Sequence, residues 1–289
     1  MSPHELTPAQ IREAACRALG EDIGPADITT TALVAESSQS QARLFVKESG
    51  ILAGIPLAIR VFNELSPSLK STTLHQDSDL LQSGATVLEL SGSTRAILSG
   101  ERSALNFLQH LSGIATETRR YVDAVAHTKC LILDTRKTIP GLRHLQKYAV
   151  RCGGGTNHRF GLYDAFMAKD NHVAIQNSPL GLRDAVLKMR AFDPDAPLIF
   201  EADTLEQVAL LAGLNVNQIL LDNMTCETMR QAVQVAQGRC LLEASGNMNL
   251  NRVREVAETG VDFISVGALT HSVRALDFSL EITTTKEVA

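Results

Sequence analysis

Six short apolar segments in the second part of the chain constrain its fold more than any other feature. They cover residues 131–134, 165–169, 198–201, 218–222, 240–244 and 263–266. Uninterrupted apolar runs of this length are typical of parallel strands that are buried on both faces. Helical patterns separate the later segments, and no dinucleotide-type glycine-rich turn follows the first one. The alternation therefore predicts an incomplete, six-stranded parallel α/β barrel rather than a doubly wound sheet.

The stretches between the later strands have the signals of helices. We expect them over residues 179–192, 204–213, 225–238 and 249–260. Thr204 and Thr225 are residues of the kind that cap helix N-termini, and glycine ends each of the last three segments. These local signals agree with the strand–loop–helix repeat.

The first part of the chain has a different pattern, which predicts a compact α+β unit. A capping-box sequence that begins at Thr7 predicts a helix that ends at Gly20. Segments 41–47 and 86–91 have the composition of strands and are bounded by glycines. A short helix is expected between them, beginning at Pro56.

One helix is expected to begin at Gly100 and a second to cover residues 116–125, with the domain boundary near Gly113 between them. We therefore predict a first domain over residues 1–112 and a barrel domain over residues 113–274. The last segment, from about residue 275 to residue 289, begins with apolar and polar residues that alternate as in a half-buried antiparallel strand. We expect this segment to join the first domain.

Charge and composition argue against several classes of partner. The formal charge is -5, and the chain has three Tyr and no Trp, so nucleic acid is not an expected partner. No apolar run approaches the roughly 20 residues that span a bilayer, and no membrane contact is expected. The five cysteines are scattered without a Cys-x-x-Cys pair, which fits a reducing compartment. We expect a cytoplasmic protein.

The stretch from Asp134 to His172 concentrates positive charge in this acidic chain. The polar residues that follow two predicted strands, and those of the loop between the strands, are Thr135, Arg136, Lys137, His158, Arg159 and Lys169. Side chains at the C-terminal ends of barrel strands converge on one mouth. We therefore expect an anionic small-molecule ligand at this mouth.

The later strand ends carry carboxylates and then small residues. Glu201 and Asp222 could act as an acid–base pair, hold a divalent cation, accept hydrogen bonds from sugar hydroxyls, or form salt bridges. Ser245–Gly246–Asn247 precedes a predicted helix, and Gly267 follows the last strand. Glycines that let backbone amides approach an anion, next to a helix N-terminus, predict a phosphate cradle.

Several residues of the basic stretch also have an ordinary explanation. Arg143, Lys147 and Arg151 lie four residues apart on an expected helix, so they could form a solvated face as readily as a binding face. Gly153–Gly155 is expected to end that helix in a flexible loop. Two rival functions also fit the mouth. One is a sugar-phosphate aldolase or isomerase with Lys169 as a Schiff-base nucleophile, and the other is a non-catalytic metabolite-binding protein.

Eight motifs follow one another along nearly the whole chain. They are Glu101–Asn106, Asp134–Thr138, Gly153–Gly155, Asn157–Arg159, Lys169–His172, Leu221–Met224, Glu243–Asn247 and Ser265–Gly267. Together they resemble the quinolinate phosphoribosyltransferase family. The resemblance implies an N-terminal α/β sandwich, an open α/β barrel and a homodimer with shared active sites. It also implies transfer of the phosphoribosyl group of 5-phosphoribosyl 1-diphosphate to quinolinate, giving nicotinate mononucleotide, diphosphate and CO2. Mg²⁺ would be carried by the diphosphate, and no organic cofactor would be needed. A relative that uses another aromatic acid stays open as an alternative.

The resemblance also implies a role for each matching residue. The carboxylates of quinolinate would be bound by Arg102, reaching in from the neighbouring subunit, and by Thr135, Arg136, His158, Arg159 and Lys169. The ribose and its phosphates would be bound by Lys137, Glu201, Asp222, Ser245, Gly246, Asn247, Gly267 and His271. Among these, Lys137, Glu201 and Asp222 would take part in catalysis.

Overall fold

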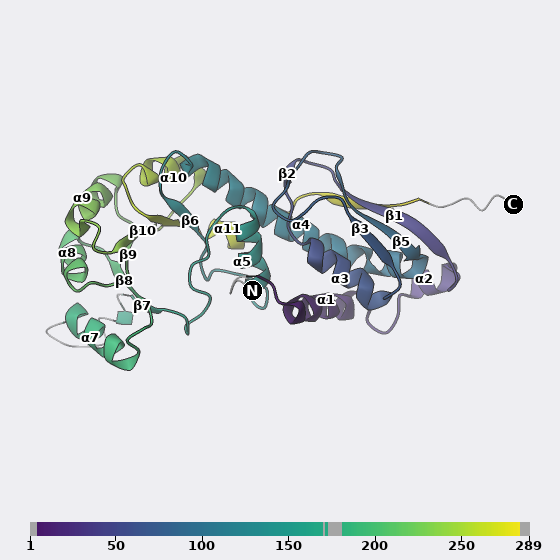
Figure 1. Cartoon of the computed structure of the whole chain (residues 1–289), viewed down its shortest axis with the longest axis horizontal. Coiled ribbons are helices and arrows are strands. Elements are labelled where there is room, and N and C mark those ends of the chain that lie inside the picture. The colour runs from purple at the N-terminus through teal and green to yellow at the C-terminus, as the bar shows by residue number, and fades with distance from the viewer. Residues whose placement is uncertain (1–4, 170, 173–180, 284–289) are drawn as a thin grey trace. The chain divides into compact units, whose positions relative to one another are not determined.

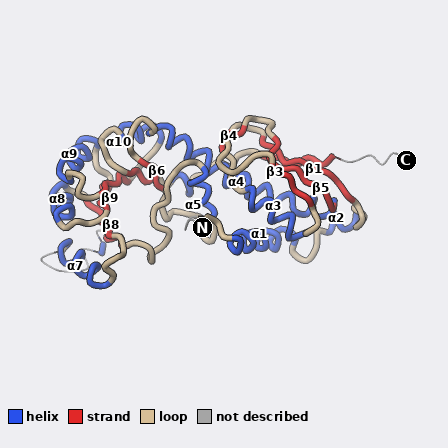
Figure 2. The backbone as a smooth tube through the Cα atoms, in the orientation of Figure 1, coloured by secondary structure: helices blue, strands red, loops and turns tan. Residues whose placement is uncertain are grey.

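The computed structural model describes residues 5–169, 171–172 and 181–283, and these fold as two compact units. The first unit is drawn from Met1–Glu117, His144–Gly154 and Val273–Ala289, and the second from Thr118–Arg143 and Gly155–Ser272. Figures 1 and 2 show that each unit packs helices against its own sheet. None of the described helices has both the length and the apolar character that a membrane-spanning segment needs.

The first unit contains a four-stranded antiparallel sheet in the order β12-β1-β5-β3. Its strands are β1 (Gln39–Val46), β3 (Lys70–Thr73), β5 (Thr86–Ser93) and β12 (Phe278–Thr283). β1 and β12 run antiparallel, with Val46 opposite Phe278, so the predicted return of the C-terminal segment to the sandwich is confirmed. Residues 284–289 of that predicted strand lie outside the described residues.

Helices cover one face of this sheet and close its core. They are α1 (Pro8–Ile23), α3 (Ile55–Leu65) and α4 (Thr94–Val125), and the smaller elements are α2 (Ile28–Leu33), β2 (Gly50–Ile51) and β4 (Leu80–Leu81). Leu44 of β1, Phe62 of α3 and Leu108 of α4 are fully buried in one apolar cluster. The predicted capping box is present, because the Thr7 side chain accepts a hydrogen bond from the Gln10 amide and the Gln10 side chain accepts one from the Thr7 amide.

Two helix ends differ from the sequence-based expectation. The first helix passes Gly20 and ends at Ile23, before Gly24, because Ile23 packs against the apolar core. The two helices expected on either side of Gly113 are one helix, α4, of 32 residues. A Cβ atom at Gly113 would overlap the carbonyl oxygen of Arg274. Gly113 therefore permits a close approach of the chain and does not break the helix.

The second unit contains the six predicted strands, all parallel. They are β6 (Leu131–Leu133), β7 (Phe166–Ala168), β8 (Leu198–Ala202), β9 (Gln218–Asp222), β10 (Leu241–Ser245) and β11 (Phe263–Ser265), in the order β6-β11-β10-β9-β8-β7. The described parts of β6 and β7 are consecutive in the chain but do not pair with each other. The barrel is therefore open between these two strands, which confirms the predicted fold class.

Helices alternate with these strands and lie on the outer side of the sheet in Figure 2. They are α7 (Leu182–Phe192), α8 (Leu205–Gly213), α9 (Cys226–Ala236) and α10 (Leu250–Ala257), followed by the short α11 (Ala268–His271). The side chains of Thr204, Thr225 and Asn249 cap α8, α9 and α10. The predicted helix start at residues 179–180 lies outside the described residues. α5 (Arg143–Cys152), apart from its first residue Arg143, groups with the first unit.

Candidate active site

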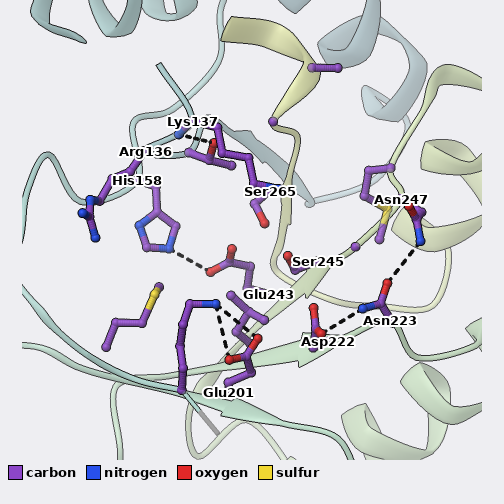
Figure 3. Close-up of a pocket in the computed structure, with 18 of the residues that line it drawn as sticks. Arg136, Lys137, His158, Glu201, Asp222, Asn223, Glu243, Ser245, Asn247 and Ser265 are labelled. Carbon is purple, nitrogen blue, oxygen red and sulfur yellow. Dashed lines mark hydrogen bonds and ion pairs between the residues drawn. The ribbon is translucent and has the colours of Figure 1, made fainter. Parts of the chain in front are cut away.

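The C-terminal ends of the parallel strands surround a cavity of about 800 Å³ in the second unit. Every site residue predicted from the sequence except Arg102 lines it: Thr135, Arg136, Lys137, His158, Arg159, Lys169, Glu201, Asp222, Ser245, Gly246, Asn247, Gly267 and His271. Arg102 lies on α4 in the first unit, where its side chain is exposed. Figure 3 shows cationic and carboxylate side chains facing the same space.

Two arginines on the β6–β7 side of the cavity lie close enough to affect each other. Burial and the charge of Arg136 lower the pKa of Arg159 from its usual value. One Arg159 Nη donates to the carbonyl oxygen of Ala165 at 3.1 Å. The Nε atoms of both arginines are buried and have no hydrogen-bond partner among the described residues. Two confined cations with unused donors are suited to a ligand with more than one carboxylate.

The loop that carries His158 and Arg159 is held by the end of β6. Asp134 is fully buried, and its carboxylate accepts hydrogen bonds from the Asn157 side chain at 2.6 Å and from the His158 amide at 2.9 Å. The Thr156 amide donates to the carbonyl oxygen of Ile132 at 2.8 Å. The helix ends at Cys152, before the triple-glycine run, as predicted. The segment after the glycines, which was expected to be flexible, is held by these backbone and carboxylate hydrogen bonds.

Arg143 is neither on a solvated face nor in the lining of the cavity. Its guanidinium donates to the Thr138 hydroxyl at 3.0 Å, to the carbonyl oxygen of Phe160 at 3.0 Å and to that of Arg136 at 3.5 Å. Arg143 thus ties the loop of Arg136 to the loop of Arg159. Lys147, expected to share its face, is fully buried, and neither it nor Arg151 lines the cavity.

On the β7–β8 side, a cation and a carboxylate are paired. Lys169 Nζ lies 3.3 Å from each carboxylate oxygen of Glu201. The side chain of Glu201 is 11% exposed and that of Lys169 is 50% exposed. Lys169 was expected to bind quinolinate and Glu201 to bind the ribose. Both assignments require that substrate binding breaks the ion pair between Lys169 and Glu201. The motif residue Asp170 lies outside the described residues.

The ends of β9 and β10 form a polar turn around Asn223. The Asn223 side-chain amide donates to Asp222 at 2.8 Å, and its oxygen accepts from Asn247 at 3.3 Å. The Asn223 backbone amide also donates to the Ser245 carbonyl at 3.0 Å. Gly246 has φ +95°, and a Cβ atom there would overlap the Asn223 side chain. The position therefore requires glycine, as expected for a cradle that brings backbone close to a ligand.

The end of β11 brings Lys137 and His271 together. The Thr270 hydroxyl donates to the carbonyl oxygen of Lys137 at 2.8 Å. A Cβ atom at Gly267 would lie 3.1 Å from Nε2 of His271 and 3.2 Å from Cδ of Lys137. The glycine therefore leaves space in which both side chains can reach one anionic group.

Six further lining residues had no site role in the sequence analysis, although three of them lie within its motifs: Asn223, Glu243, Ser265, Met167, Leu220 and Met248. Ala268, which follows Gly267 of the predicted cradle, also lines the cavity. Of these residues, Glu243 is the residue with an ionisable side chain, and it is only 1% exposed. A usable signal was present, because Glu243 precedes Ser245 by two residues on one strand, and such side chains point to the same face. A carboxylate within an apolar strand was therefore a candidate for the site.

A metal ion would find few ligands here apart from the carboxylates. In the described ranges, no group of three or more His, Cys, Asp or Glu residues could hold a metal ion. Glu201 and Asp222 both line the cavity. Mg²⁺ commonly binds one or two carboxylates together with substrate phosphates, so these two residues fit an ion that arrives with a diphosphate.

Comparison with known proteins assigns both parts of the chain to one family. Residues 27–112 match the N-terminal domain of quinolinate phosphoribosyl transferase, and residues 114–281 match its C-terminal domain. The chain is 44% identical over 277 residues to nicotinate-nucleotide pyrophosphorylase (carboxylating) of Mycobacterium leprae, covering 94% of this chain and 96% of the relative. The Bacillus subtilis relative, named as a probable enzyme of the same kind, is 43% identical, with 92% and 91% covered. A solved nicotinate-nucleotide pyrophosphorylase from Francisella tularensis superposes with a TM-score of 0.92 at 39% identity, covering 97% of this chain and 98% of that one. The chain belongs to the quinolinate phosphoribosyltransferase family.

Proposed function

We propose that this chain transfers the phosphoribosyl group of 5-phosphoribosyl 1-diphosphate, the sugar donor, to quinolinate and releases CO2. The products are nicotinate mononucleotide and diphosphate, as in de novo NAD biosynthesis. The relatives' names describe this reaction in its two directions, decarboxylating toward the mononucleotide and carboxylating in reverse. The observation that carries the proposal is a single cavity with confined cations on one side and carboxylates and a glycine cradle on the other.

The division of the cavity assigns a side to each substrate. Arg136 and Arg159 face a ligand whose two carboxylates can use their unpaired donors. Lys137, Gly246 and Gly267 surround a space suited to phosphates, because ammonium groups and backbone amides both stabilise anions. Holding both substrates in one cavity supplies the alignment that a group transfer needs.

The chemistry requires stabilisation of positive charge at the ribose. The bond from C1 to the diphosphate oxygen breaks and the diphosphate keeps the electron pair, while the quinolinate nitrogen forms the new bond to C1. Glu201 and Asp222, at the ends of β8 and β9, are the lining carboxylates that we assign to the charge developing at C1. The bond between the neighbouring ring carbon and its carboxylate then breaks, CO2 leaves, and the positive charge of the quaternary nitrogen stabilises the electron pair that stays on this carbon. The carbon takes up a proton from solvent, which completes nicotinate mononucleotide.

Three further features belong to this proposal. Mg²⁺ would come with the diphosphate and meet Glu201 and Asp222, where it would neutralise phosphate charge. The active unit would be a homodimer in which Arg102 completes the dicarboxylate side of the partner's cavity; the exposed position of Arg102 on α4 supports this. We also propose a cytoplasmic location, which the five cysteines without disulfides support.

The test supplies the purified full chain with Mg²⁺, the sugar donor and either quinolinate or nicotinate. We expect equal amounts of mononucleotide and CO2 from quinolinate. Nicotinate has one carboxylate and would leave part of the arginine pair unmatched, so we expect little product from it. Efficient use of nicotinate, or mononucleotide without CO2, would refute the assignment.

Mixing inactive Arg102→Ala and Asp222→Ala chains should restore activity if two subunits share each active site, whereas no restoration would contradict the shared site.

A further inference from the structure

Glu243 is a buried carboxylate in the wall of the cavity that no substrate role above uses. It lies in β10, opposite Leu220 of β9 in the sheet register, and is 1% exposed. An isolated carboxylate at such a position costs several kcal/mol of desolvation unless hydrogen-bond donors surround it. An apolar residue would fit the strand better, so the contacts of this carboxylate should explain its presence.

Two donors meet one oxygen of this carboxylate. Oε2 of Glu243 accepts a hydrogen bond from Nε2 of His158 at 3.1 Å and another from the side-chain amide of Gln218. Oε1 is buried and has no hydrogen-bond partner in the part of the chain that is described. Figure 3 shows the bonded edge of Glu243 pointing toward His158. The carboxylate is thus directed at the histidine.

The contacts of His158 define which of its nitrogens carries the proton. The backbone amide of Arg159 donates to Nδ1 of His158 at 2.6 Å. A nitrogen that accepts an amide hydrogen bond is not protonated in the neutral ring, so the proton is on Nε2 and is donated to Glu243. The His158 side chain is only 7% exposed. Its ring therefore links the buried carboxylate to the backbone of Arg159.

We propose that Glu243 is a positioning residue for dicarboxylate recognition. It fixes His158 as the Nε2–H tautomer and, through Nδ1, fixes the backbone from which Arg159 reaches the substrate. In this arrangement His158 acts on quinolinate through Arg159, because Nε2 donates to Glu243 and Nδ1 accepts from the Arg159 amide. The inference rests on the proposed function in one respect, namely that Arg159 binds a carboxylate of quinolinate.

Two substitutions separate this role from others. Glu243→Met keeps the length of the side chain but removes the acceptor, so the His158 ring loses its partner. Glu243→Gln keeps a carbonyl oxygen that can accept from both His158 and Gln218, and removes only the charge. If hydrogen bonding to His158 is the role, Glu243→Gln should preserve function and Glu243→Met should not.

The first measurement is made on the full chain without substrates, so it does not depend on the reaction. Histidines are labelled with ¹⁵N, and spectra are recorded at about pH 8, where an ordinary histidine is neutral. His158 is assigned from the signal lost in His158→Asn. We expect a single Nε2–H tautomer in the native chain and in Glu243→Gln, and a mixture of tautomers in Glu243→Met. A native Nδ1–H tautomer, or no change in Glu243→Met, would overturn the proposal.

The second measurement compares the Michaelis constants of the two substrates. We expect Glu243→Met to raise the KM of quinolinate about tenfold, equivalent to about 1.4 kcal/mol, with little change in the KM of the sugar donor. Glu243→Gln should stay within about threefold of the native chain for both constants, a difference below 1 kcal/mol.

Equal rises in both Michaelis constants, with a lower Tm, would mean a merely structural role and contradict the proposal. A fall in kcat in both variants with unchanged KM values would also contradict it. A native chain without transferase activity would refute the proposed function, while the tautomer measurement would still decide the link to His158.

Discussion

Gly246 offers a sharp test of the phosphate cradle, because its replacement by alanine disturbs one side of the cavity. The residue has φ +95°, where a side chain introduces strain of about 1–3 kcal/mol. The new Cβ would also overlap the Asn223 amide. That amide must move, which breaks its bonds to Asp222 at 2.8 Å and to Asn247 at 3.3 Å, each contributing about 1 kcal/mol.

The strain can be separated from the site effect by a matched control. Gly260 has φ +94°, and its nearest neighbour beyond the adjoining chain is a Val233 methyl at 3.5 Å from the added Cβ. Gly260→Ala therefore carries similar backbone strain but displaces no residue of the cavity. Urea unfolding should show Gly260→Ala destabilised by about 1–3 kcal/mol and Gly246→Ala by about 3–5 kcal/mol, because two hydrogen bonds are lost as well.

Steady-state kinetics should then distinguish the two variants. We expect Gly246→Ala to raise the KM of the sugar donor at least about tenfold, which corresponds to about 1.4 kcal/mol, while the KM of quinolinate changes little. Gly260→Ala should leave both constants near native values. If Gly246→Ala binds the sugar donor normally, or if Gly260→Ala shows the same loss, the cradle is assigned to the wrong residues.

Three other predictions concern the loops, the cysteines and a helix cap. Arg143→Met should raise the KM of quinolinate roughly tenfold. It should also lower the free energy of unfolding by about 3 kcal/mol or more, since Arg143 donates two hydrogen bonds at 3.0 Å and charged hydrogen bonds contribute about 1.5–3 kcal/mol each. Arg143→Lys should lose less, and an unchanged KM would contradict a role in holding the arginine loops. Burial raises the pKa of the Cys152 thiol to about 12, whereas Cys16 is exposed. Mass spectrometry after iodoacetamide treatment should therefore find Cys16 alkylated first and Cys152 alkylated only when the chain unfolds. Equal labelling of the two cysteines in the folded chain would refute this prediction. Hydrogen bonds from Thr30 lower the pKa of Asp27, the residue that caps α2. The charge of Asp27 therefore stabilises the fold above the unfolded pKa of about 3.9, and this contribution is lost as pH falls through the lower folded pKa. The stability difference between the native chain and Asp27→Asn should shrink below about pH 4, and a constant difference in urea unfolding from pH 3 to 7 would contradict this prediction.

Local patterns predicted the elements that place the site. Apolar runs bounded by turn residues located all six parallel strands, and the strand expected over residues 218–222 has those bounds in the structure. Because parallel strands present their C-terminal ends together, the residues after them could be grouped into one mouth. All the predicted residues of that mouth line the cavity, while their roles toward each substrate stay predictions.

The features that sequence reasoning missed depend on contacts between distant residues. Gly113 was expected to lie between two helices. It lies within one helix, at a point where any Cβ atom would overlap the carbonyl oxygen of Arg274. Arg143 and Lys147 share helical spacing, yet one donates to two loops and the other is buried. The link from Glu243 to His158 joins residues far apart in sequence. Spacing alone carries no information about such partners.

The most direct test of the account is the ratio of the two Michaelis constants in Arg159→Ala. The account places Arg159 on the dicarboxylate side of the cavity, with a guanidinium whose Nε has no partner among the described residues. Loss of a charged partner for a buried carboxylate costs about 2–5 kcal/mol. The KM of quinolinate should therefore rise by at least about thirtyfold, and that of the sugar donor should stay near its native value. Equal rises in both constants, or a larger rise for the sugar donor, would contradict the division of the cavity into a dicarboxylate side and a phosphoribosyl side.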